Sequence, residues 1–416
     1  MLAKAGEQKS GEATVMRVFV FDLLAYDRHF DFAKAERYLP YPLPGEHFDP
    51  EVAARTYEEH FEIWEEMERL GFDGLGLNEH HTTPHGLMNS PNMFSALAAQ
   101  RTKNLKLLML GNLLPLHTPL RIAEELAVVD CISRGRVMAG FARGVPREYR
   151  VYNVPMSESR ARFEEGMEIV LGAWTQKLFS YEGKFWQHKD ISIWPRPYQQ
   201  PHPSIWIPFT GSKETIEYAG KHNFNAVIAS SHRGVVEDVV SFYAKSLAQH
   251  GHEITPDHIC FFTDAYVAPS VAQAREEYSP YFLYFNQTLW HHGSLPSANP
   301  TAPSPGPDQA GSTFDYVRPE NRPFASMDRA KIRAMNQSDV DRNLETGAYA
   351  WGSPKEVAAK LIERAEAAGS NNLLINMNLG AMPNKMFLEQ VRRFGREVLP
   401  ILQAHEVKRV PVREMA

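Results

Sequence analysis

The stretch that decides the fold is residues 105–144, which read LKLLMLGNLLPLHTPLRIAEELAVVDCISRGRVMAGFARG. Two short apolar runs, Leu105–Leu110 and Arg136–Phe141, flank the segment Leu120–Ile132, whose apolar residues recur with helical period. A strand, a helix and a second strand joined by a few polar or glycine residues predict a βαβ unit and therefore a parallel sheet.

The same alternation continues on both sides of this unit. The run Glu51–Leu70 is amphipathic and ends at Gly71, a usual position for the glycine that terminates a helix. The 416 residues fit one barrel with loop insertions or two domains. Eight strands in total favour one (β/α)8 TIM barrel, an α/β fold, spanning residues 1–416. The other expected strands are Arg17–Leu24, Phe72–Leu77, Ser204–Pro208, Ala226–Ala229, Ile259–Ala268 and Asn372–Asn376, and the other expected helices are Asn92–Arg101, Glu158–Trp174, Lys213–His222, Val235–His250 and Asn384–Leu402.

Two segments interrupt the pattern, and both would lie on the C-terminal rim of the barrel. Residues His29–Pro50 follow the first strand and contain several aromatic residues and prolines, so they could form one wall of a pocket. Residues His291–Arg322 are rich in proline, serine and glycine and have no hydrophobic period. Two interpretations of this second segment are equally open, a mobile lid over the substrate and a disordered surface insertion.

The composition is that of an ordinary globular protein, with 43% hydrophobic and 23% charged residues. A net charge of -6 argues against binding to nucleic acids. The two cysteines, Cys131 and Cys260, have no His or Cys neighbours at metal-ligand spacing, so we expect two reduced and mostly buried thiols. No apolar signal core and no run of roughly 18 apolar residues are evident, which predicts a cytoplasmic protein without membrane contact.

Three polar residues, Glu79, His80 and His81, directly follow the predicted strand Phe72–Leu77. Because active sites of such barrels lie where the strands end, these residues are candidates for catalysis. An imidazole titrates near neutral pH, so at least one histidine could act as general acid or base, although a solvated loop histidine is the commoner case. A metal site would need a third ligand, and no nearby spacing supplies one, so no metal site is predicted.

A phosphate site is predicted from three segments. Arg143 lies in Gly140–Gly144 at the end of the fourth strand, and Arg160 lies near the start of the following helix. Residues Thr210–Thr215 open a helix after the fifth strand, where free N–H groups and hydroxyl side chains bind phosphate. The alternatives are that the arginines pair with surface carboxylates and that Ser212 is only an N-cap. The three segments together predict a phosphate-bearing cofactor across the barrel mouth. No GxGxxG motif after the first strand and no P-loop motif occur, so neither a Rossmann dinucleotide site nor a P-loop is expected.

From about Arg17 to Leu402 the sequence resembles the bacterial luciferase family of flavin monooxygenases, in particular its alpha subunits. The matching motifs are Gly71-Phe72-Asp73 before Glu79-His80-His81, Leu114–Arg121 with Ala123-Glu124, Asp130 with Ser133–Arg136, Gly140–Gly144, Arg150–Tyr152 and Ser159-Arg160. The resemblance implies a cytoplasmic monooxygenase that takes reduced FMN (FMNH2) from a separate flavin reductase. With O2, and through a flavin hydroperoxide, it would oxygenate a small apolar organic substrate.

The resemblance also assigns roles to individual residues. His80 would be the catalytic histidine, supported by His81 and Glu79. The FMN phosphate would contact Arg143, Arg160, Ser212 and Thr215, with Gly211 beside them. Leu110 and Gly111 would lie under the flavin ring, where the family often has a cis peptide bond. The resemblance also implies a dimer through the helices Asn92–Arg101 and Leu120–Ile132. The simpler expectation is a homodimer, and pairing with a homologue is the alternative.

The chain also departs from the luciferase pattern. It has Ala142 where luciferase has a cysteine, Gly211 where the family has an acidic residue, and a shorter loop Gly144–Tyr149. A long-chain aldehyde substrate therefore does not follow from the resemblance. Aromatic residues available for an apolar pocket are Phe21, Trp194, Trp206, Phe209 and Trp351, and for Trp206 and Trp351 a place in the core is an equal alternative.

Two further functions fit the same fold. One is a reductase or dehydrogenase that passes hydride through a flavin or deazaflavin without oxygen. The other is a flavin-binding barrel without catalytic turnover. Replacement of His80 and the reaction of FMNH2-loaded protein with oxygen would separate these alternatives from a monooxygenase.

Overall fold

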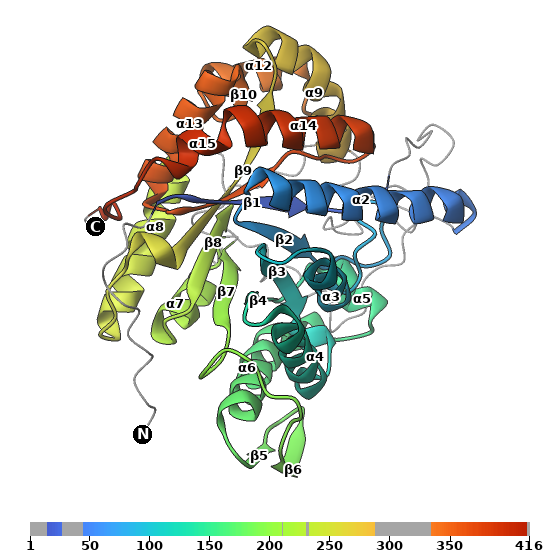
Figure 1. The fold of residues 1–416 in the computed structure, drawn as a ribbon. Coiled ribbons are helices and arrows are strands. Elements are labelled where there is room, and N and C mark those ends of the chain that lie inside the picture. Colours follow the sequence, from blue (N-terminus) through green and yellow to red (C-terminus); the bar gives the residue numbers. More distant parts are fainter. Residues whose placement is uncertain (1–14, 27–44, 210, 230–232, 288–333, 414–416) are drawn as a thin grey trace.

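Eight parallel strands close into a barrel, as the sequence predicted (Figure 1). The structure is a computed structural model that describes residues 15–26, 45–209, 211–229, 233–287 and 334–413. Each strand pairs with the next in parallel, and the last one, β11, pairs again with the first, β1, which closes the barrel. The barrel strands are β1 (Arg17–Asp22), β2 (Gly74–Asn78), β3 (Lys106–Leu113), β4 (Val137–Ala142), β7 (Ser204–Phe209), β8 (Asn225–Ala229), β9 (Ile259–Val267) and β11 (Asn372–Asn376).

Helices surround this barrel (Figure 1). The main ones are α2 (Pro50–Leu70), α3 (Pro91–Arg101), α4 (Pro119–Ser133), α6 (Ser159–Thr175), α7 (Lys213–Lys221), α8 (Arg233–Gln249), α9 (Val271–Gln287), α13 (Pro354–Ala368), α14 (Asn384–Glu397) and α15 (Leu399–Gln403). The predicted last helix is thus two helices, because Val398 separates α14 from α15. Among the described residues no helix combines the length and apolarity that crossing a membrane requires.

Several elements were not predicted from the sequence. They include the antiparallel hairpin of β5 (Phe179–Glu182) and β6 (Gln187–Ile191), the short helix α5 (Pro146–Val151), α12 (Gln337–Glu345) and β10 (Ala350–Gly352). The short 3-10 helices are η2 (Gly45–His47), η3 (Leu114–Leu116), η4 (Met156–Glu158) and η5 (Pro256–His258). The segment His291–Arg322 and most of His29–Pro50 lie outside the described residues.

Local sequence explains where α2 begins and ends. The Asp49 carboxylate accepts a hydrogen bond from the Glu51 N–H at 3.0 Å, which caps the helix at its first turn. Gly71 ends the helix with φ of 86°, a left-handed conformation that glycine adopts without steric cost. The chain can then turn directly into β2, the strand that precedes the Glu-His-His motif.

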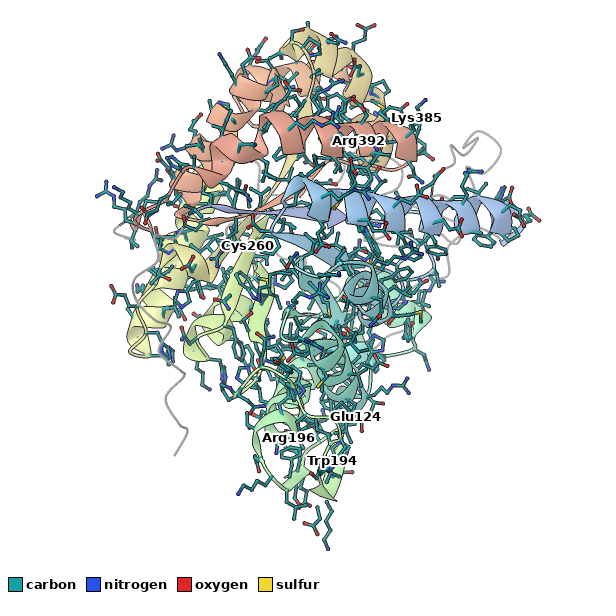
Figure 2. The ribbon with its side chains drawn as sticks, viewed as in Figure 1. Glu124, Trp194, Arg196, Cys260, Lys385 and Arg392 are labelled. Atoms are coloured by element: carbon teal, nitrogen blue, oxygen red, sulfur yellow. The ribbon has the colours of Figure 1, made fainter. Side chains whose placement is uncertain are left out.

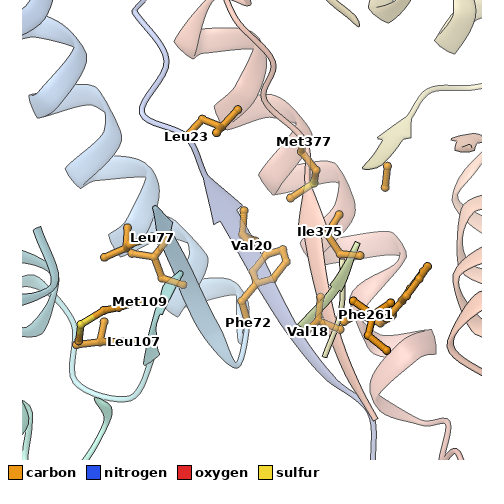
Figure 3. Close-up of a cluster of buried hydrophobic side chains, with 14 of the residues drawn as sticks. Val18, Val20, Leu23, Phe72, Leu77, Leu107, Met109, Phe261, Ile375 and Met377 are labelled. Carbon is orange, nitrogen blue, oxygen red and sulfur yellow. The ribbon is translucent and has the colours of Figure 1, made fainter. Parts of the chain in front are cut away.

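Alternate residues of each strand pack on the two sides of the barrel wall. Val18 and Val20 of β1 face the surrounding helices and belong to the main hydrophobic core (Figure 3). Their neighbour Phe19 points into the barrel, where an inner layer also contains Leu108, Met138, Trp206, Val227, Cys260 and Leu374. Trp206 is therefore a core residue, 4% exposed, and its indole N–H donates to Ser204 Oγ at 2.9 Å.

Above this packed layer the barrel interior is open to solvent. Several of the next inward-facing residues toward the strand ends are partly or fully exposed, namely Phe21, Leu110, Pro208, Ala229, Phe262 and Asp264, whereas Asn376, which lies between Phe21 and Asp264, is buried. The barrel is thus filled below and accessible at its C-terminal mouth, where active sites of this fold are built.

Candidate active site

The Glu-His-His motif leaves β2 with Glu79 turned toward β3. The Glu79 side chain is 2% exposed, and its Oε2 accepts a hydrogen bond from the Leu113 N–H at 3.0 Å. Its other oxygen, Oε1, lies 2.8 Å from His81 Nε2 and also makes a short contact with Nε2 of His117, which follows η3. A buried carboxylate is therefore shared by two imidazoles.

His117 corrects the expectation that no third ligand lies near Glu79 and His81. The spacing argument failed because His117 comes from the loop after the next strand. The ligand atoms of the three residues all lie within 4.8 Å of one another, so this cluster could hold a metal ion. Hydrogen bonds alone also satisfy it, and Tyr152 extends it, with its hydroxyl 2.9 Å from His81 Nδ1.

The Glu79 cluster favours separated charges. Burial by itself would raise the pKa of Glu79, but hydrogen bonds from His117 and His81 outweigh burial and lower the pKa. Burial would lower the pKa of His117, yet its hydrogen bond to Glu79 and the charge of that carboxylate raise the pKa overall. Each partner thus shifts the pKa of the other toward its charged form.

His80 lies apart from this cluster and pairs with a different carboxylate. Its Nδ1 is 2.9 Å from Oε1 of Glu148, whose side chain is 0% exposed. The other oxygen of Glu148 accepts a hydrogen bond from the Val145 N–H at 2.9 Å, so the carboxylate is fixed in place. The His80 side chain is 17% exposed, and its ring centroid lies 4.9 Å from that of His85.

Residues of α5, together with Tyr152 directly after it, contact both histidines and also Arg143, a residue predicted to bind phosphate. Glu148 contacts His80, Tyr152 contacts His81, and the Tyr149 hydroxyl donates to the Arg143 carbonyl. Sequence reasoning missed Glu148 and His117, although each follows a predicted strand end, as His80 does. The same position rule that selected His80 could have found them.

The predicted phosphate residues come together between the ends of β4 and β7. Arg143 Nη1 donates to Ser159 Oγ at 3.4 Å, and Arg160 Nη2 donates to Ser212 Oγ at 3.4 Å. Burial lowers the pKa of Arg160, and the positive charge of Arg143 lowers it further. Two neighbouring guanidinium groups therefore create a local field that a bound anion would relieve.

The start of α7 supplies the remaining part of this site. Ser212 is the N-cap residue, but its side chain makes no capping hydrogen bond, so first-turn N–H groups are available to an anion. Gly211 precedes it with φ of 92°, and Thr215, partly exposed, lies within the first turn. Residue Thr210 lies outside the described residues.

A carboxylate also enters this site. Oε2 of Glu214 accepts hydrogen bonds from Arg160 Nη2 at 3.1 Å and from Ser212 Oγ at 2.9 Å. The alternative that Arg160 pairs with a surface carboxylate is thus realised in this structure. The Glu214 carboxylate accepts from Arg160 and Ser212, the same donors that a bound phosphate would use, so Glu214 and a phosphate would compete for them.

The peptide bond between Leu110 and Gly111 is cis, as the resemblance implied. A Cβ on Gly111 would lie 3.1 Å from the backbone of Phe141 and of Ala142, so a side chain there would press against β4. Leu110 is partly exposed on the inner face. The residues present fit a phosphorylated flavin, with a positively charged cradle at the rim and a close backbone surface at the mouth.

The aromatic residues considered for the pocket lie in several places, and one of them, Phe21, lies at the barrel mouth. Phe21 and Phe262 meet edge to face at the mouth, with centroids 5.0 Å apart. Trp351 is buried beside Tyr278, and its indole nitrogen has no partner among the described residues. Trp194 is 87% exposed beyond the β5–β6 hairpin and does not line a pocket (Figure 2).

Comparisons with known proteins identify the family of the chain. The family model described as luciferase-like monooxygenase matches residues 41–371. An uncharacterized protein of Sinorhizobium fredii is 36% identical over 42% of this chain and 52% of that protein. The alkanal monooxygenase alpha chain of Photobacterium leiognathi is 30% identical over 49% of this chain and 60% of its own length. The chain thus spans 52% and 60% of the lengths of these two relatives.

Longer matches have lower identity. The oxygenase component of a flavin-dependent trigonelline monooxygenase from Acinetobacter baylyi is 26% identical over 71% of this chain and 81% of that protein. Solved structures of similar fold include monooxygenase RslO1 of Streptomyces bottropensis, with TM-score 0.69 and 24% identity, covering 92% of this chain and 99% of that chain.

Two further structures share the fold. The oxygenating constituent of 3,6-diketocamphane monooxygenase of Pseudomonas putida, in complex with FMN, has TM-score 0.68 and 17% identity, covering 96% of this chain and 100% of that chain. An F420-dependent secondary alcohol dehydrogenase has TM-score 0.64 and 13% identity, covering 93% and 99%. At these identities the likeness shows a common fold only.

Proposed function

The chain belongs to the luciferase-like monooxygenase family, and from this premise we propose that it uses FMNH2 and O2 to oxygenate a small apolar organic substrate. The proposed partner is a separate flavin reductase, and one relative is named as the oxygenase component of a flavin-dependent monooxygenase. The observation that supports the proposal most is that a carboxylate-paired histidine and a two-arginine anion cradle are joined by one short segment.

The arginine cradle would bind and orient the cofactor. Arg143, Arg160 and Ser212 would donate hydrogen bonds to the FMN phosphate, helped by the first-turn N–H groups of α7 and by Thr215. The flavin ring would then reach the mouth beside Leu110 and Gly111. When bound, FMNH2 supplies the electrons that activate oxygen.

His80 would handle the proton of the reaction. Because Nδ1 of His80 donates to the buried Glu148 carboxylate, Nε2 is the nitrogen that takes up or delivers a proton. The hydrogen bond to Glu148 holds the ring in one orientation. Glu79 and His81 lie beside His80 in the chain, and their hydrogen bond to each other would help to fix the loop that carries His80.

The mouth itself would exclude water from the reacting atoms. Phe21 and Phe262 form an apolar wall on the side of β1 and β9. Such a wall suits both the flavin ring and a substrate with an apolar body. The choice among the possible oxygenation products would depend on how His80 controls the proton.

We also propose a homodimer. Met93 and Leu97 are one turn apart on α3 and are 62% and 42% exposed. Val128 and Ile132, one turn apart on α4, are each 40% exposed. Because α3 and α4 pack against each other, these residues give an apolar surface that a second copy would cover.

A second candidate function is hydride transfer through a deazaflavin, since an F420-dependent dehydrogenase shares the fold. A non-catalytic flavin-binding barrel is the third. The test is to load the purified chain with FMNH2 and measure oxygen consumption and oxygen incorporation with a panel of apolar substrates. Incorporation of isotopically labelled oxygen supports the monooxygenase. Tight F420 binding with no oxygen consumption would support the dehydrogenase, and FMN binding without any turnover would support the third alternative.

A further inference from the structure

The wall of the mouth formed by β9 and β11 carries unsatisfied polar groups. Asn376 pairs in register with Phe21 on one side and with Asp264 on the other, so both polar side chains face the barrel interior. Asn376 Nδ2 donates to Asp264 Oδ1 at 2.8 Å. Asn376 is 3% exposed, and within the described part of the chain its Oδ1 has no hydrogen-bond partner.

Buried amide oxygens without a partner are rare because desolvation costs about 1–3 kcal/mol per group. Two more side-chain amides at this mouth also have buried atoms without a hydrogen-bond partner among the described residues. Both amide atoms of Asn78, at the end of β2, lack a partner among the described residues, as do those of Asn378, two residues beyond β11. The concentration of such groups at the open end of the barrel indicates that a ligand completes their hydrogen bonds.

The groups at the β9–β11 wall are mainly acceptors. The amide orientation of Asn376 follows from its hydrogen bond, since an ionised carboxylate only accepts, so Oδ1 is the amide atom left without a partner among the described residues. Asp264 is partly exposed at the mouth and adds a negative charge. The apolar pair of Phe21 and Phe262 lies on the same inner face, beside these acceptors.

We propose that Asp264 and Asn376 form a substrate-recognition site for a molecule with an apolar body and a protonated amine or other N–H donor. This inference rests on the proposed function, because it concerns the substrate that the flavin would oxygenate. The ammonium or N–H group binds between Asp264 and Asn376 Oδ1, and the apolar body lies against Phe21 and Phe262. Neither residue contacts the predicted phosphate cradle.

The surroundings of Asp264 suit this role. Burial raises the pKa of Asp264 to about 6, against the opposing effects of the Asn376 hydrogen bond and the Arg364 charge. The other titratable groups acting on it are Tyr278 of α9 and Tyr349 beside β10, whose pKa values burial raises. These tyrosines stay neutral and Arg364 stays cationic around neutral pH. Asp264 is thus the group there that changes charge near pH 6.

The test uses the full chain loaded with oxidised FMN and two probes of equal size, benzylammonium and benzoate. Dissociation constants are measured by calorimetry and by perturbation of the flavin absorbance. We expect benzylammonium to bind at least about ten-fold more tightly than benzoate, as hydrogen bonds to charged groups typically allow. Asp264→Asn should remove this preference, and Asn376→Leu should reduce it. The matched control Asp190→Asn, at an exposed residue of β6, should leave it unchanged.

A second measurement does not depend on a variant folding. In the unaltered protein, benzylammonium affinity should fall about ten-fold as the pH drops from above to below the Asp264 pKa of about 6. A pH-independent affinity, or no preference between the probes, would overturn the proposal and leave ordered water as the occupant. If Asp264→Asn instead weakens FMN binding itself, the N–H donor belongs to the flavin ring and the substrate assignment is wrong.

Failure of the proposed substrate-recognition site can be distinguished from failure of the proposed monooxygenase function. FMN affinity and oxygen consumption are measured on the same preparations without any probe. Their failure would count against the monooxygenase, whereas equal affinity for the two probes counts only against the role of Asp264 and Asn376.

Discussion

Nδ1 of His80 lies 2.9 Å from Oε1 of Glu148, although 68 residues separate them in the chain. The carboxylate is fully buried, and its second oxygen is held by the Val145 N–H. A histidine held in this way has one nitrogen committed to the carboxylate, and the proton transfer proposed for His80 would use the other nitrogen. This pair is the basis of the first prediction.

Glu148→Gln should lower the rate of substrate oxygenation by about 10–100-fold, the range usual for groups that orient a functional histidine. The amide retains the size of the side chain but replaces the carboxylate that accepts the hydrogen bond from His80 Nδ1. We expect the loss in kcat, with KM for the substrate and the dissociation constant for FMN unchanged, measured by product formation and by flavin fluorescence.

Two variants serve as comparisons for Glu148→Gln. Glu182→Gln, at an exposed residue of the β5–β6 hairpin, should keep full activity. His80→Gln should lose about 10²–10⁴-fold, as removal of a general acid or base does. Equal activity of Glu148→Gln and the unaltered protein would show that the pairing has no role in turnover.

Arg143→Met should weaken FMN binding by about 10–100-fold, because it would remove the charged hydrogen bond that we propose from Arg143 to the phosphate. Riboflavin has no phosphate, so its affinity should not change. Fluorescence titration with both flavins measures the difference directly, and Arg101→Met on the surface of α3 is the matched control. A parallel loss of riboflavin affinity would mean that Arg143 supports the fold of the pocket instead.

Glu214→Gln should act in the opposite direction and tighten FMN binding by about three- to ten-fold. Burial would raise the pKa of Glu214, but the Ser212 hydrogen bond and the charge of Arg160 lower it, so the group is a carboxylate at neutral pH. It then competes with phosphate for Arg160 and Ser212 and repels a dianion. The same titration tests this, and a weaker FMN complex would show that Glu214 orders the cradle for its ligand.

The barrel could be predicted because its signals are local. A helix such as Leu120–Ile132 reveals its period within fifteen residues or so, and the short apolar run Asn372–Asn376 matches β11 at both ends. The β5–β6 hairpin was missed because its residues are mostly exposed and show no clear apolar alternation.

In the candidate site, the residues of the Glu79–His81 segment could be predicted from the sequence, but their partners could not. Residues that share a strand end, such as Glu79 and His80, are visible in the sequence. Their partners His117 and Glu148 come from the ends of other strands, and only closure of the barrel brings them near. Asp264 escaped notice because it lies inside the predicted strand Ile259–Ala268, where a polar residue has no evident partner.

Leu97→Glu combined with Val128→Glu should convert the proposed dimer to a monomer. Both residues are about two-fifths exposed, so the charges cost little in an isolated chain but would be desolvated in an interface. Sedimentation velocity measures the mass, and Leu178→Glu, an equally apolar exposed position elsewhere, is the control. A monomeric unaltered protein would contradict the expectation at once.

The fully buried pair of His60 and Asp22 should make stability depend on pH. Nδ1 of His60 lies 2.7 Å from Asp22 Oδ2, and Nε2 lies 3.1 Å from the Asn384 amide oxygen, so both nitrogens face acceptors. Burial lowers the pKa of His60, but the charge and hydrogen bond of Asp22 raise it overall. Burial by itself would raise the pKa of Asp22, but the charge and the hydrogen bond of His60 outweigh burial, so the pKa of Asp22 is lowered overall.

The two shifts act at opposite ends of the pH scale. The raised pKa of His60 gives stability that is complete below its ordinary value of 6.5 and is lost as pH rises through the folded value. The lowered pKa of Asp22 gives stability that is present above 3.8 and is lost as pH falls further. Unfolding by guanidinium should therefore show a free energy that declines on the alkaline side, starting above the ordinary His60 value.

Removal of the Asp22 charge should lower the free energy of unfolding, because it leaves the buried His60 without its ionic partner. We expect Asp22→Asn to lower the free energy of unfolding by about 3–5 kcal/mol at neutral pH. In the double variant Asp22→Asn with His60→Gln, both the charge and the alkaline decline should disappear. An alkaline decline of unchanged size in the double variant would show that another group, and not His60, causes it.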